Sequence, residues 1–505
     1  MKGAGKLALV LAALLLLTAC GQTVPSVGGS TPPAEESPAP VSIPFSLPYY
    51  EEVSLHPITG MSQTNLTLAS QVYEGLFELD NQFKASAVLA ESWQQEENGL
   101  VWTFRIKQAS FSDGSPLTGE DVANSLEEAR KSERYGARLK DVRAVRAKGD
   151  TVTVTLNRPH GNLPVLLDIP VVRERGDGVP LGTGWYAFAE KNGGMVLERT
   201  SRCPEGLPEE ISLASIQSAE ELLYAFDTRD ISLVVSDLTG SDTLGFSGGY
   251  EIWDHPTTTM VYLGFRTDSG FCRDEVVRQA VSCALDREGV VNTLYALHAR
   301  TAVLPVSPQS GLYDADVAGM LEYTNQHAAE LLKNGGYSLR DGVLYQGRWP
   351  VTLTLIVSTD NSFRLAAADH IAGELKKLGI HVTVEKLPWQ DFLDRLNRGN
   401  FDLYLAETML TADFDLEVLV GSSGALNYGR WKEAETDRLL NELRAAPEGT
   451  EKTVAANLYS HLQNTMPLAP VCFKEQTVLT QWGRVTGLTP TRANCFAGGT
   501  WEIQG

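Results

Sequence analysis

Apolar and polar positions alternate in several short stretches of the chain, as they do in strands with one buried face. "LVWTFRI" (100–106) and "DTVTVTL" (150–156) are two such stretches. Other stretches repeat their apolar residues at helical spacing. "QTNLTLASQVYEGLF" (63–77) predicts a helix that ends near Gly75, and "DEVVRQAVSCALDREGVVNTLY" (274–295) predicts a long one. The succession of strands and helices predicts α/β architecture with mixed sheets.

The region from 352 to 407 gives the clearest order of elements. "TLTLIVS" (352–358), "FRLAAADHIAGELKKLG" (363–379) and "IHVTVEKL" (380–387) predict a strand, a helix and a strand, which form a β-α-β unit. A further helix and strand follow, namely "WQDFLDRLNRG" (389–399) and "FDLYLAE" (401–407).

The stretch "FSDGSPLTGEDV" (111–122) holds three carboxylates and could be read as an acid-base or metal site. Asp113-Gly114, however, is a turn signal. Thr118 and Asp121 have the spacing of a capping box, and the helix that follows would place Glu120 and Asp121 in its first turn. Acidic side chains are favoured there by the helix dipole. The stretch therefore predicts a turn and a helix cap.

Two further motifs match enzyme or nucleotide sites but lack the elements that such sites need. "GFSGG" (245–249) matches the nucleophile elbow, in which a helix follows the serine, whereas the residues after Ser247 predict strand and turn. "GTGWYA" (182–187) matches a dinucleotide-binding pattern, but a hairpin at Asn192-Gly193 replaces the helix that would hold the pyrophosphate. We therefore expect no enzymatic activity.

The histidines and cysteines favour no metal and no other cofactor. The eight His residues show no H-E-x-x-H motif or other paired spacing, and the chain has no C-x-x-C motif. Cys272 and Cys283 lie about 16 Å apart along a predicted helix, which is too far for a disulfide. Cys472 and Cys495 are the one pair that we consider for a disulfide.

An apolar run near the N-terminus, "LALVLAALLLLTA" (7–19), follows Lys2 and Lys6. It is shorter than the roughly 20 residues that cross a bilayer, and it predicts a secretory signal peptide, residues 1–19. The run ends in "LTAC", which resembles a bacterial lipobox, and the resemblance implies cleavage before Cys20 and lipid attachment to it. Residues 20–44 are rich in Pro, Ser and Gly and predict a flexible tether.

Composition limits the partners and the number of domains. The formal net charge of −21 indicates an acidic surface. Because phosphate binding needs a basic face, we expect no nucleic acid partner. With 505 residues, of which 43% are apolar, the chain can form two or three domains.

Several blocks of the chain, taken in order, resemble family 5 of the extracellular solute-binding proteins, the oligopeptide, dipeptide and nickel type of ABC transporter lipoproteins. The blocks include "VYEGLFELD", "LAESWQQEENGLVWTFRIKQASFSDGSPLTGEDVANS", "VVRQAVSCALDREGVV", "LKKLGIHVTVEKLPWQDFLDRLNRGNFDLYL" and "LNYGRW". The resemblance runs from about Leu55 to about Pro470. It departs from the family pattern after "FDLYL", where two residues are apparently inserted in "AETMLTADFDLEVL".

The resemblance implies a fold and a division into domains. The fold would be bilobal and periplasmic-binding-protein-like, α/β with mixed sheets, with a hinge between the lobes and an extra N-terminal subdomain. Lobe one would comprise 45–77, 180–265 and 476–505, the extra domain 78–179, and lobe two 266–475.

The resemblance also implies a function. The protein would be the substrate-binding lipoprotein of an ABC importer, which captures a peptide or peptide-like solute in the interlobe cleft and delivers it to a membrane permease. It would be a monomer, lipid-anchored at the extracytoplasmic face of the cell membrane of a Gram-positive bacterium. Two alternatives stay open, a nickel- or metallophore-binding member of the same fold and a peptide-sensing signalling lipoprotein.

The ligand-binding residues are likewise implied by the resemblance. In peptide-binding relatives an Asp after the "FDLYL" strand pairs with the α-amino group of the ligand. The match implies Asp413, with Asp415 as the alternative because of the apparent insertion. A carboxylate suits this task because its hydrogen bond to an ammonium group is roughly twice as strong as a neutral one. The aligned positions on the opposite wall are Gln63, Thr64, Asn65, Thr259 and Tyr262.

Overall fold

The computed structural model describes residues 45–176, 179–485 and 487–497. The predicted signal peptide, Cys20 and the predicted tether therefore lie outside the described residues. Within the described ranges, no helix has both the length and the apolar character needed to cross a bilayer.

The first sheet has the strand order β1-β10-β9-β8. Its strands are β1 (Ser46–Tyr49), β10 (Glu210–Ser215), β9 (Gly194–Arg199) and β8 (Tyr186–Lys191). β1 pairs with β10 in parallel, and the other pairs are antiparallel. Helix α1 (Gln63–Val72) contacts β1 and β8. This helix is shorter than predicted, because the backbone is already extended at Tyr73 and Gly75 forms a β-bridge with Pro170.

The second sheet is antiparallel, with the order β4-β5-β7-β6. Its strands are β4 (Ala90–Glu96), β5 (Val101–Ile106), β7 (Thr151–Leu156) and β6 (Val142–Lys148), and short elements nearby are β2 (Phe77–Leu79), β3 (Ala85–Ala87), η1 (Glu97–Gly99) and η2 (Leu163–Leu166). The predicted alternation is confirmed, since every second side chain of β5 and β7 is buried. Helix α2 (Gly119–Ala129) contacts β6 and β7.

The start of α2 answers the question that the acidic stretch at 111–122 raised. The Thr118 side chain accepts a hydrogen bond from the Asp121 N–H, and the Asp121 carboxylate accepts one from the Thr118 N–H at 2.8 Å. The capping box is confirmed. Asp121 also accepts hydrogen bonds from Arg173, at 2.8 and 2.6 Å, so its carboxylate is occupied by structural partners.

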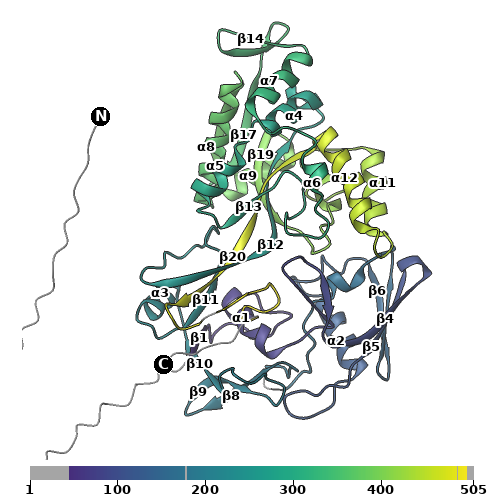
Figure 1. The fold of residues 1–505 in the computed structure, drawn as a ribbon, viewed down its shortest axis with the longest axis vertical. Coiled ribbons are helices and arrows are strands. Elements are labelled where there is room, and N and C mark those ends of the chain that lie inside the picture. The colour runs from purple at the N-terminus through teal and green to yellow at the C-terminus, as the bar shows by residue number, and fades with distance from the viewer. Residues whose placement is uncertain (1–44, 177–178, 486, 498–505) are drawn as a thin grey trace, which may run out of the picture. The chain divides into compact units, whose positions relative to one another are not determined.

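The third sheet is mixed and has the order β11-β20-β12-β19-β17-β18, with β13 paired to β20. Its strands are β11 (Leu233–Ser236), β20 (Leu468–Gln481), β12 (Tyr250–Phe265), β19 (Leu403–Met409), β17 (Thr352–Ser358), β18 (His381–Leu387) and β13 (Ala299–Thr301). β17 is parallel to both β18 and β19, which confirms the predicted β-α-β unit. The long strands β12 and β20 run side by side (Figure 1). Their register shifts between Pro256 and Met260 and again between Val261 and Tyr262.

Some helices pack on the third sheet, and others lie in the segments between its strands. α8 (Ser362–Lys377) contacts β17, β18 and β19. The others in the described residues are α3 (Ala219–Asp227), η3 (Phe271–Arg273), α4 (Glu275–Cys283), α6 (Ala315–Ala318), α7 (Asn325–Asn334), α9 (Trp389–Arg398), α10 (Glu417–Val420), α11 (Ala434–Arg444) and α12 (Glu451–Thr465), and a small sheet comprises β14 (Tyr337–Arg340), β15 (Val343–Gln346) and β16 (Trp349–Pro350).

The prediction of a single helix over 274–295 is wrong. The chain forms α4, then one turn, α5 (Arg287–Gly289), and then a π-helical turn, η4 (Val290–Leu294). Arg287 explains the break, because its buried guanidinium donates to the backbone oxygens of Ser282, Ala302 and Pro470. A buried charge needs such acceptors, and the Ser282 oxygen, in the last turn of α4, is one that Arg287 uses.

Candidate ligand-binding site

Three cavities in the described part of the chain lie around β19 and the loop that follows it. Cavity A has a volume of about 460 Å³ and is lined by residues of α1, of the segments 74–78 and 134–138, and of the C-terminal segment 492–494. Cavity B, of about 660 Å³, lies between 137–166 and 408–426. Cavity C, of about 270 Å³, is lined by 82–84, 310–312, 412–416 and the ends of α11 and α12. Arg138 and Met409 line both A and B, while His160 and Asp413 line both B and C.

Asp413 lies on the loop after β19, in the wall between cavities B and C. The loop is held by Phe414, which is fully buried and packs edge-on against Phe83 and Phe473. The carboxylate oxygen Oδ2 of Asp413 lies 3.0 Å from Nε2 of His160. The other ring nitrogen of His160 accepts the Asn162 N–H at 3.1 Å, so Nε2 carries the proton and donates to Asp413.

The electrostatic surroundings keep Asp413 ionised. Burial is the largest single cause and opposes its charged form, but the hydrogen bond from His160, the charge of His160 and the hydrogen bonds from Thr411 and the Asp415 N–H together hold the pKa of Asp413 below its ordinary value. Burial, and next the charge of Asp413, raise the pKa of Asp415. Asp415 lies 3.6 Å from the Lys140 ammonium group. Of the two candidates, Asp413 is thus the more firmly anionic.

The residues expected on the opposite wall do not all reach a cavity. Gln63 lines cavity A. The Asn65 side chain is used by the protein itself, since its amide donates to the oxygens of Tyr50 and Val53 and accepts the Tyr50 N–H at 2.8 Å. Thr64 and Asn65 line none of the three cavities.

The two residues expected from β12, Thr259 and Tyr262, do not line a cavity either. Tyr262 is 2% exposed and packs edge-on against Tyr404, so the structure places it in the core and not in a cavity wall. Thr259 also lines none of the three cavities, whereas its neighbours Thr257 and Thr258 line cavity A.

Sequence reasoning missed a group of basic residues in cavity A. Arg134, Arg138 and Arg492 line this cavity together with Asp168 and Tyr135. We call the three arginines the arginine pole. Arg134 and Arg138 lie on a segment of turns, so helical spacing gave no signal for them. No signal pointed to Arg492, because it approaches the others only through the return of the C-terminal segment.

Of the glutamates that line cavity A, Glu74 has partners outside the arginine pole. Glu74 forms an ion pair with Arg202 and accepts a hydrogen bond from Thr183 at 2.8 Å. Burial, and next the charge of Glu74, raise the pKa of Glu78. His255 is 2% exposed, and burial lowers its pKa to about 4, so it is neutral at physiological pH.

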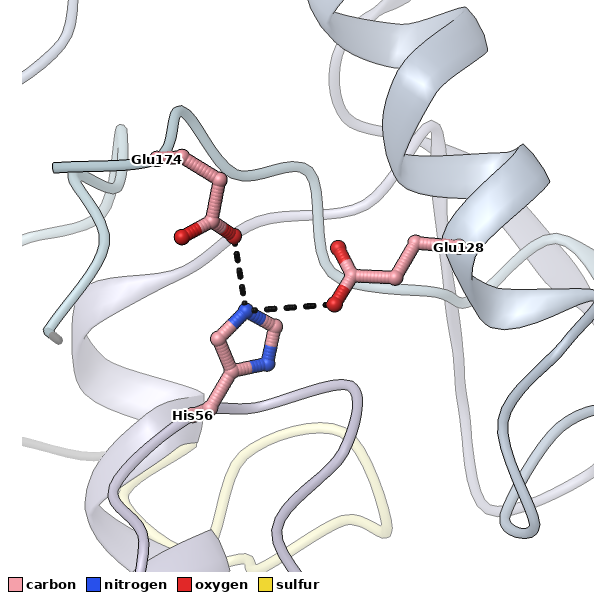
Figure 2. A group of neighbouring side chains, drawn as sticks. All are labelled: His56, Glu128 and Glu174. Carbon is pink, nitrogen blue, oxygen red and sulfur yellow. Dashed lines mark hydrogen bonds and ion pairs between the residues drawn. The ribbon is translucent and has the colours of Figure 1, made fainter.

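Figure 2 shows His56 between Glu128 and Glu174, a grouping that could be taken for a metal site. Nε2 of His56 lies 2.9 Å from Glu174 and 3.5 Å from Glu128. Nδ1 accepts the N–H groups of Ile58 and Thr59, each at 3.2 Å. Nε2 must therefore carry the ring proton, whereas a metal ligand would need a free lone pair there. The geometry fits hydrogen bonding to the two carboxylates.

A second acidic grouping, Asp286, His370 and Glu374, is also held by protein partners. Both Glu374 oxygens accept from the Lys377 ammonium group at 2.7 Å, and Asp286 accepts the Gly289 N–H at 2.8 Å. His370 lies 3.1 Å from the other Asp286 oxygen. These contacts account for all three side chains without an ion.

Ser247 has none of the surroundings of a nucleophile elbow. Its hydroxyl donates to Asp227 at 2.7 Å, and β12 follows it in place of a helix. Cys472 and Cys495 are both free thiols, so the pair considered for a disulfide is not formed. Burial raises the pKa of each thiol to about 12.

Comparison with known proteins adds the following. The sequence model described as "Bacterial extracellular solute-binding proteins, family 5 Middle" matches residues 84–426. Oligopeptide-binding protein AppA of Bacillus subtilis is 26% identical over 413 residues, which cover 75% of this chain and 76% of AppA. The structure of MppA, a periplasmic murein tripeptide binding protein in an unliganded open form, has a TM-score of 0.74 at 18% identity and covers 90% of this chain and 96% of its own.

A nickel ABC transporter structure from Bacillus halodurans has the same TM-score of 0.74, at 19% identity, with 89% of this chain and 98% of its own covered. Likenesses at such low identity show the fold. The predicted fold class, a bilobal α/β binding-protein fold with mixed sheets, is confirmed.

Proposed function

The chain belongs to family 5 of the bacterial extracellular solute-binding proteins, and from this premise we propose that it captures a peptide or peptide-like solute between its lobes and delivers it to the permease of an ABC importer. AppA, which it resembles over three quarters of its length, is named as an oligopeptide-binding protein. Solute binding, and no catalysis, is the activity that we assign to the protein.

The observation that carries the peptide assignment is the state of Asp413. Its side chain is 17% exposed in the wall between two cavities, and its pKa is held below the ordinary value, which favours the anion. Oδ2 is engaged by His160, Oδ1 has a long contact, 3.4 Å, with the Asp415 N–H, and the Thr411 side chain also hydrogen-bonds to the carboxylate. Oδ1 can accept a hydrogen bond from a ligand ammonium group, and such a charge-assisted bond is roughly twice as strong as a neutral one.

The domain boundaries belong to the same proposal, with one adjustment. The β4-β5-β7-β6 sheet falls within the proposed extra domain (78–179), and β17, β18 and β19 fall within the proposed lobe two (266–475). In β12, however, residues Thr259–Phe265 pair with β19. We therefore place the crossing between lobes at the register shift between Pro256 and Met260, opposite Phe473 and Glu475 of β20. A bulge at this place suits a hinge, because it interrupts the ladder locally.

The location follows from the family and from the N-terminal motif. Members are extracellular solute-binding proteins. We propose that Cys20 carries the lipid that keeps this protein, as a monomer, at the outer face of a Gram-positive cell membrane, since "LTAC" ends an apolar run preceded by two lysines.

Native mass spectrometry of the purified protein would identify the solute that it retains. A peptide supports the proposal. A retained nickel complex would instead assign the protein to the group represented by the Bacillus halodurans structure. Deletion of the neighbouring permease genes separates import from sensing, because a sensor's downstream response would persist and an importer's uptake would stop.

Calorimetry tests Asp413 directly. Removal of one partner of a buried charge pair costs about 2–5 kcal/mol, so Asp413→Ala should weaken binding of a free-amine peptide by about 30-fold or more. The same peptide with an acetylated amine should bind wild-type protein equally poorly. Asp415→Ala is the matched control. Equal affinity of wild-type protein for both peptides would remove the amine anchor.

A further inference from the structure

A buried lysine beside the proposed hinge connects the two proposed lobes. Lys474, on β20, is 2% exposed. Its ammonium group donates a hydrogen bond to the Asp237 carboxylate at 2.5 Å and lies 3.5 Å from the Glu407 carboxylate on β19. Asp237 directly follows β11 and falls in the proposed lobe one, whereas Lys474 and Glu407 fall in the proposed lobe two. The lysine therefore pairs with one carboxylate on each side of the hinge.

A second contact joins the same two parts of the chain. The backbone oxygen of Thr239 accepts a hydrogen bond from the side-chain amide of Asn361, the N-cap residue of α8, at 2.9 Å. Thr239 and Asn361 are each 1% exposed. We call Asp237, Thr239, Asn361 and Lys474 the hinge latch. None of the four lines cavity A, B or C.

The hinge latch lies on the face of β20 that points away from the Asp413 loop. Phe473 packs against Phe414, the residue after Asp413. Neighbouring side chains of a strand point to opposite faces, and Lys474 accordingly extends toward Asp237. A rotation that brings the lobes together on the Asp413 side separates them on the opposite face. Closure of the cleft would therefore pull the latch apart.

The hinge latch can open without leaving a buried charge unpaired. If the segment 237–239 moves away, Lys474 keeps its ion pair with Glu407, which is also held by Arg364 of α8 at 3.1 Å. A buried ion stripped of every partner would be strongly unfavourable. The Asp237 side chain is 41% exposed, so water can replace the lysine as its partner. The contact is thus suited to form and break reversibly.

We propose that the hinge latch opposes closure of the cleft and so sets the affinity of the protein for its solute. This inference rests on the proposed function, because the hinge and the cleft belong to it. The latch residues lie outside the three cavities, so they act on binding through the equilibrium between open and closed lobes. The apparent dissociation constant is the intrinsic one divided by the binding-competent fraction. A weaker latch therefore means tighter binding.

The test weakens the hinge latch from each side. Asn361→Ser keeps a good N-cap residue and removes the amide donor to Thr239. Asp237→Asn removes the charge that faces Lys474. Each variant should bind trialanine about 3- to 10-fold tighter than wild type by calorimetry, since that is the order of one hydrogen bond. Asp360→Asn is the matched control, because Asp360 is 35% exposed and pairs with Arg364, within lobe two, at 2.8 Å. It should leave the affinity unchanged.

A second measurement reports the lobes without solute. Single-molecule energy transfer between dyes on Lys191→Cys in lobe one and Lys377→Cys in lobe two, in Cys20→Ala protein, gives the distribution of lobe distances. The five native cysteines of the described chain are buried, so the dyes attach to the introduced thiols. Asn361→Ser and Asp237→Asn should each enlarge the closed population, and Asp360→Asn should not.

The outcomes separate the hinge latch from the proposed function. An unchanged or lower affinity for trialanine in both latch variants, or a lobe distribution identical to that of wild type, overturns the latch and leaves peptide binding standing. If trialanine binds neither wild type nor variants, that result counts against the proposed function. The solute-free lobe distribution then decides the latch by itself.

Discussion

Glu417 forms ion pairs with Lys140 and Arg158, which lie far from it in the chain. Removing the charge of Glu417 should weaken this contact. The carboxylate, at the start of α10, accepts hydrogen bonds from Arg158 at 2.5 and 2.8 Å and from Lys140 at 2.9 Å. Arg158 also pairs with Asp141 at 2.7 Å. Glu417→Gln keeps the shape of the side chain and removes its charge.

The size of the effect follows from the pKa of Glu417. Hydrogen bonds from Arg158, and next those from Lys140, lower it against the opposing effect of burial, from 4.5 to about 2. At about 1.4 kcal/mol per unit, this shift corresponds to roughly 3 kcal/mol. Because 24% of the side chain is exposed, solvent screens the interaction, and we expect about 1–2 kcal/mol.

The pH dependence gives the decisive test. The folded pKa lies below the unfolded one, so the contribution is fully present above about pH 4.5 and is lost as the pH falls toward 2. Thermal unfolding should show Glu417→Gln about 1–2 °C less stable than wild type at pH 7, with the gap narrowing by pH 3.5. Glu133→Gln, an exposed glutamate, is the control. A gap that is absent at pH 7, or that does not narrow in acid, would refute the reasoning.

Two further predictions concern the N-terminus and Ser247. Cys20→Ala should lose membrane fractionation and acylation, measured by detergent partitioning and mass spectrometry, and a wild-type protein found wholly soluble and unacylated would contradict the lipid anchor. Ser247→Ala should change neither ligand affinity nor any hydrolysis seen in a purified sample, because its hydroxyl is bonded to Asp227 and no helix follows it. An esterase activity that this substitution abolished would reverse the assignment.

The spacing of apolar residues predicted those strands and helices whose formation depends mainly on the local sequence. β5, β7 and the β-α-β unit of β17, α8 and β18 follow directly from the spacing of apolar residues. The break after α4 could not be predicted in this way. It depends on Arg287, whose acceptors at Ala302 and Pro470 lie 15 and 183 residues away. The sequence pattern does not distinguish a buried arginine from one on the polar face of a helix.

The candidate ligand-binding site likewise contains one residue that the sequence predicted and others that it could not. Asp413 could be selected because a strand and a family pattern precede it. Tyr262 could not be placed from the resemblance alone, because its burial depends on the pairing of β12 with β19 and on its contact with Tyr404. The arginine pole needs the C-terminal segment to return beside Tyr135, and such a long-range contact has no local signature.

The proposed hinge lies beside residues that line cavity A. His255 and Thr257 on β12, and Gln476 on β20, line cavity A beside the register shift between Pro256 and Met260. Asp413 follows β19, which pairs with β12 on one side of that shift. The arginine pole is built from 134–138 and the C-terminal segment, on the other side of it in our division of the chain. A solute that contacts both Asp413 and the walls of cavity A would therefore contact parts that the proposed hinge motion moves relative to each other. Its affinity would differ between open and closed states, and that difference is the free energy that a ligand has available to drive closure.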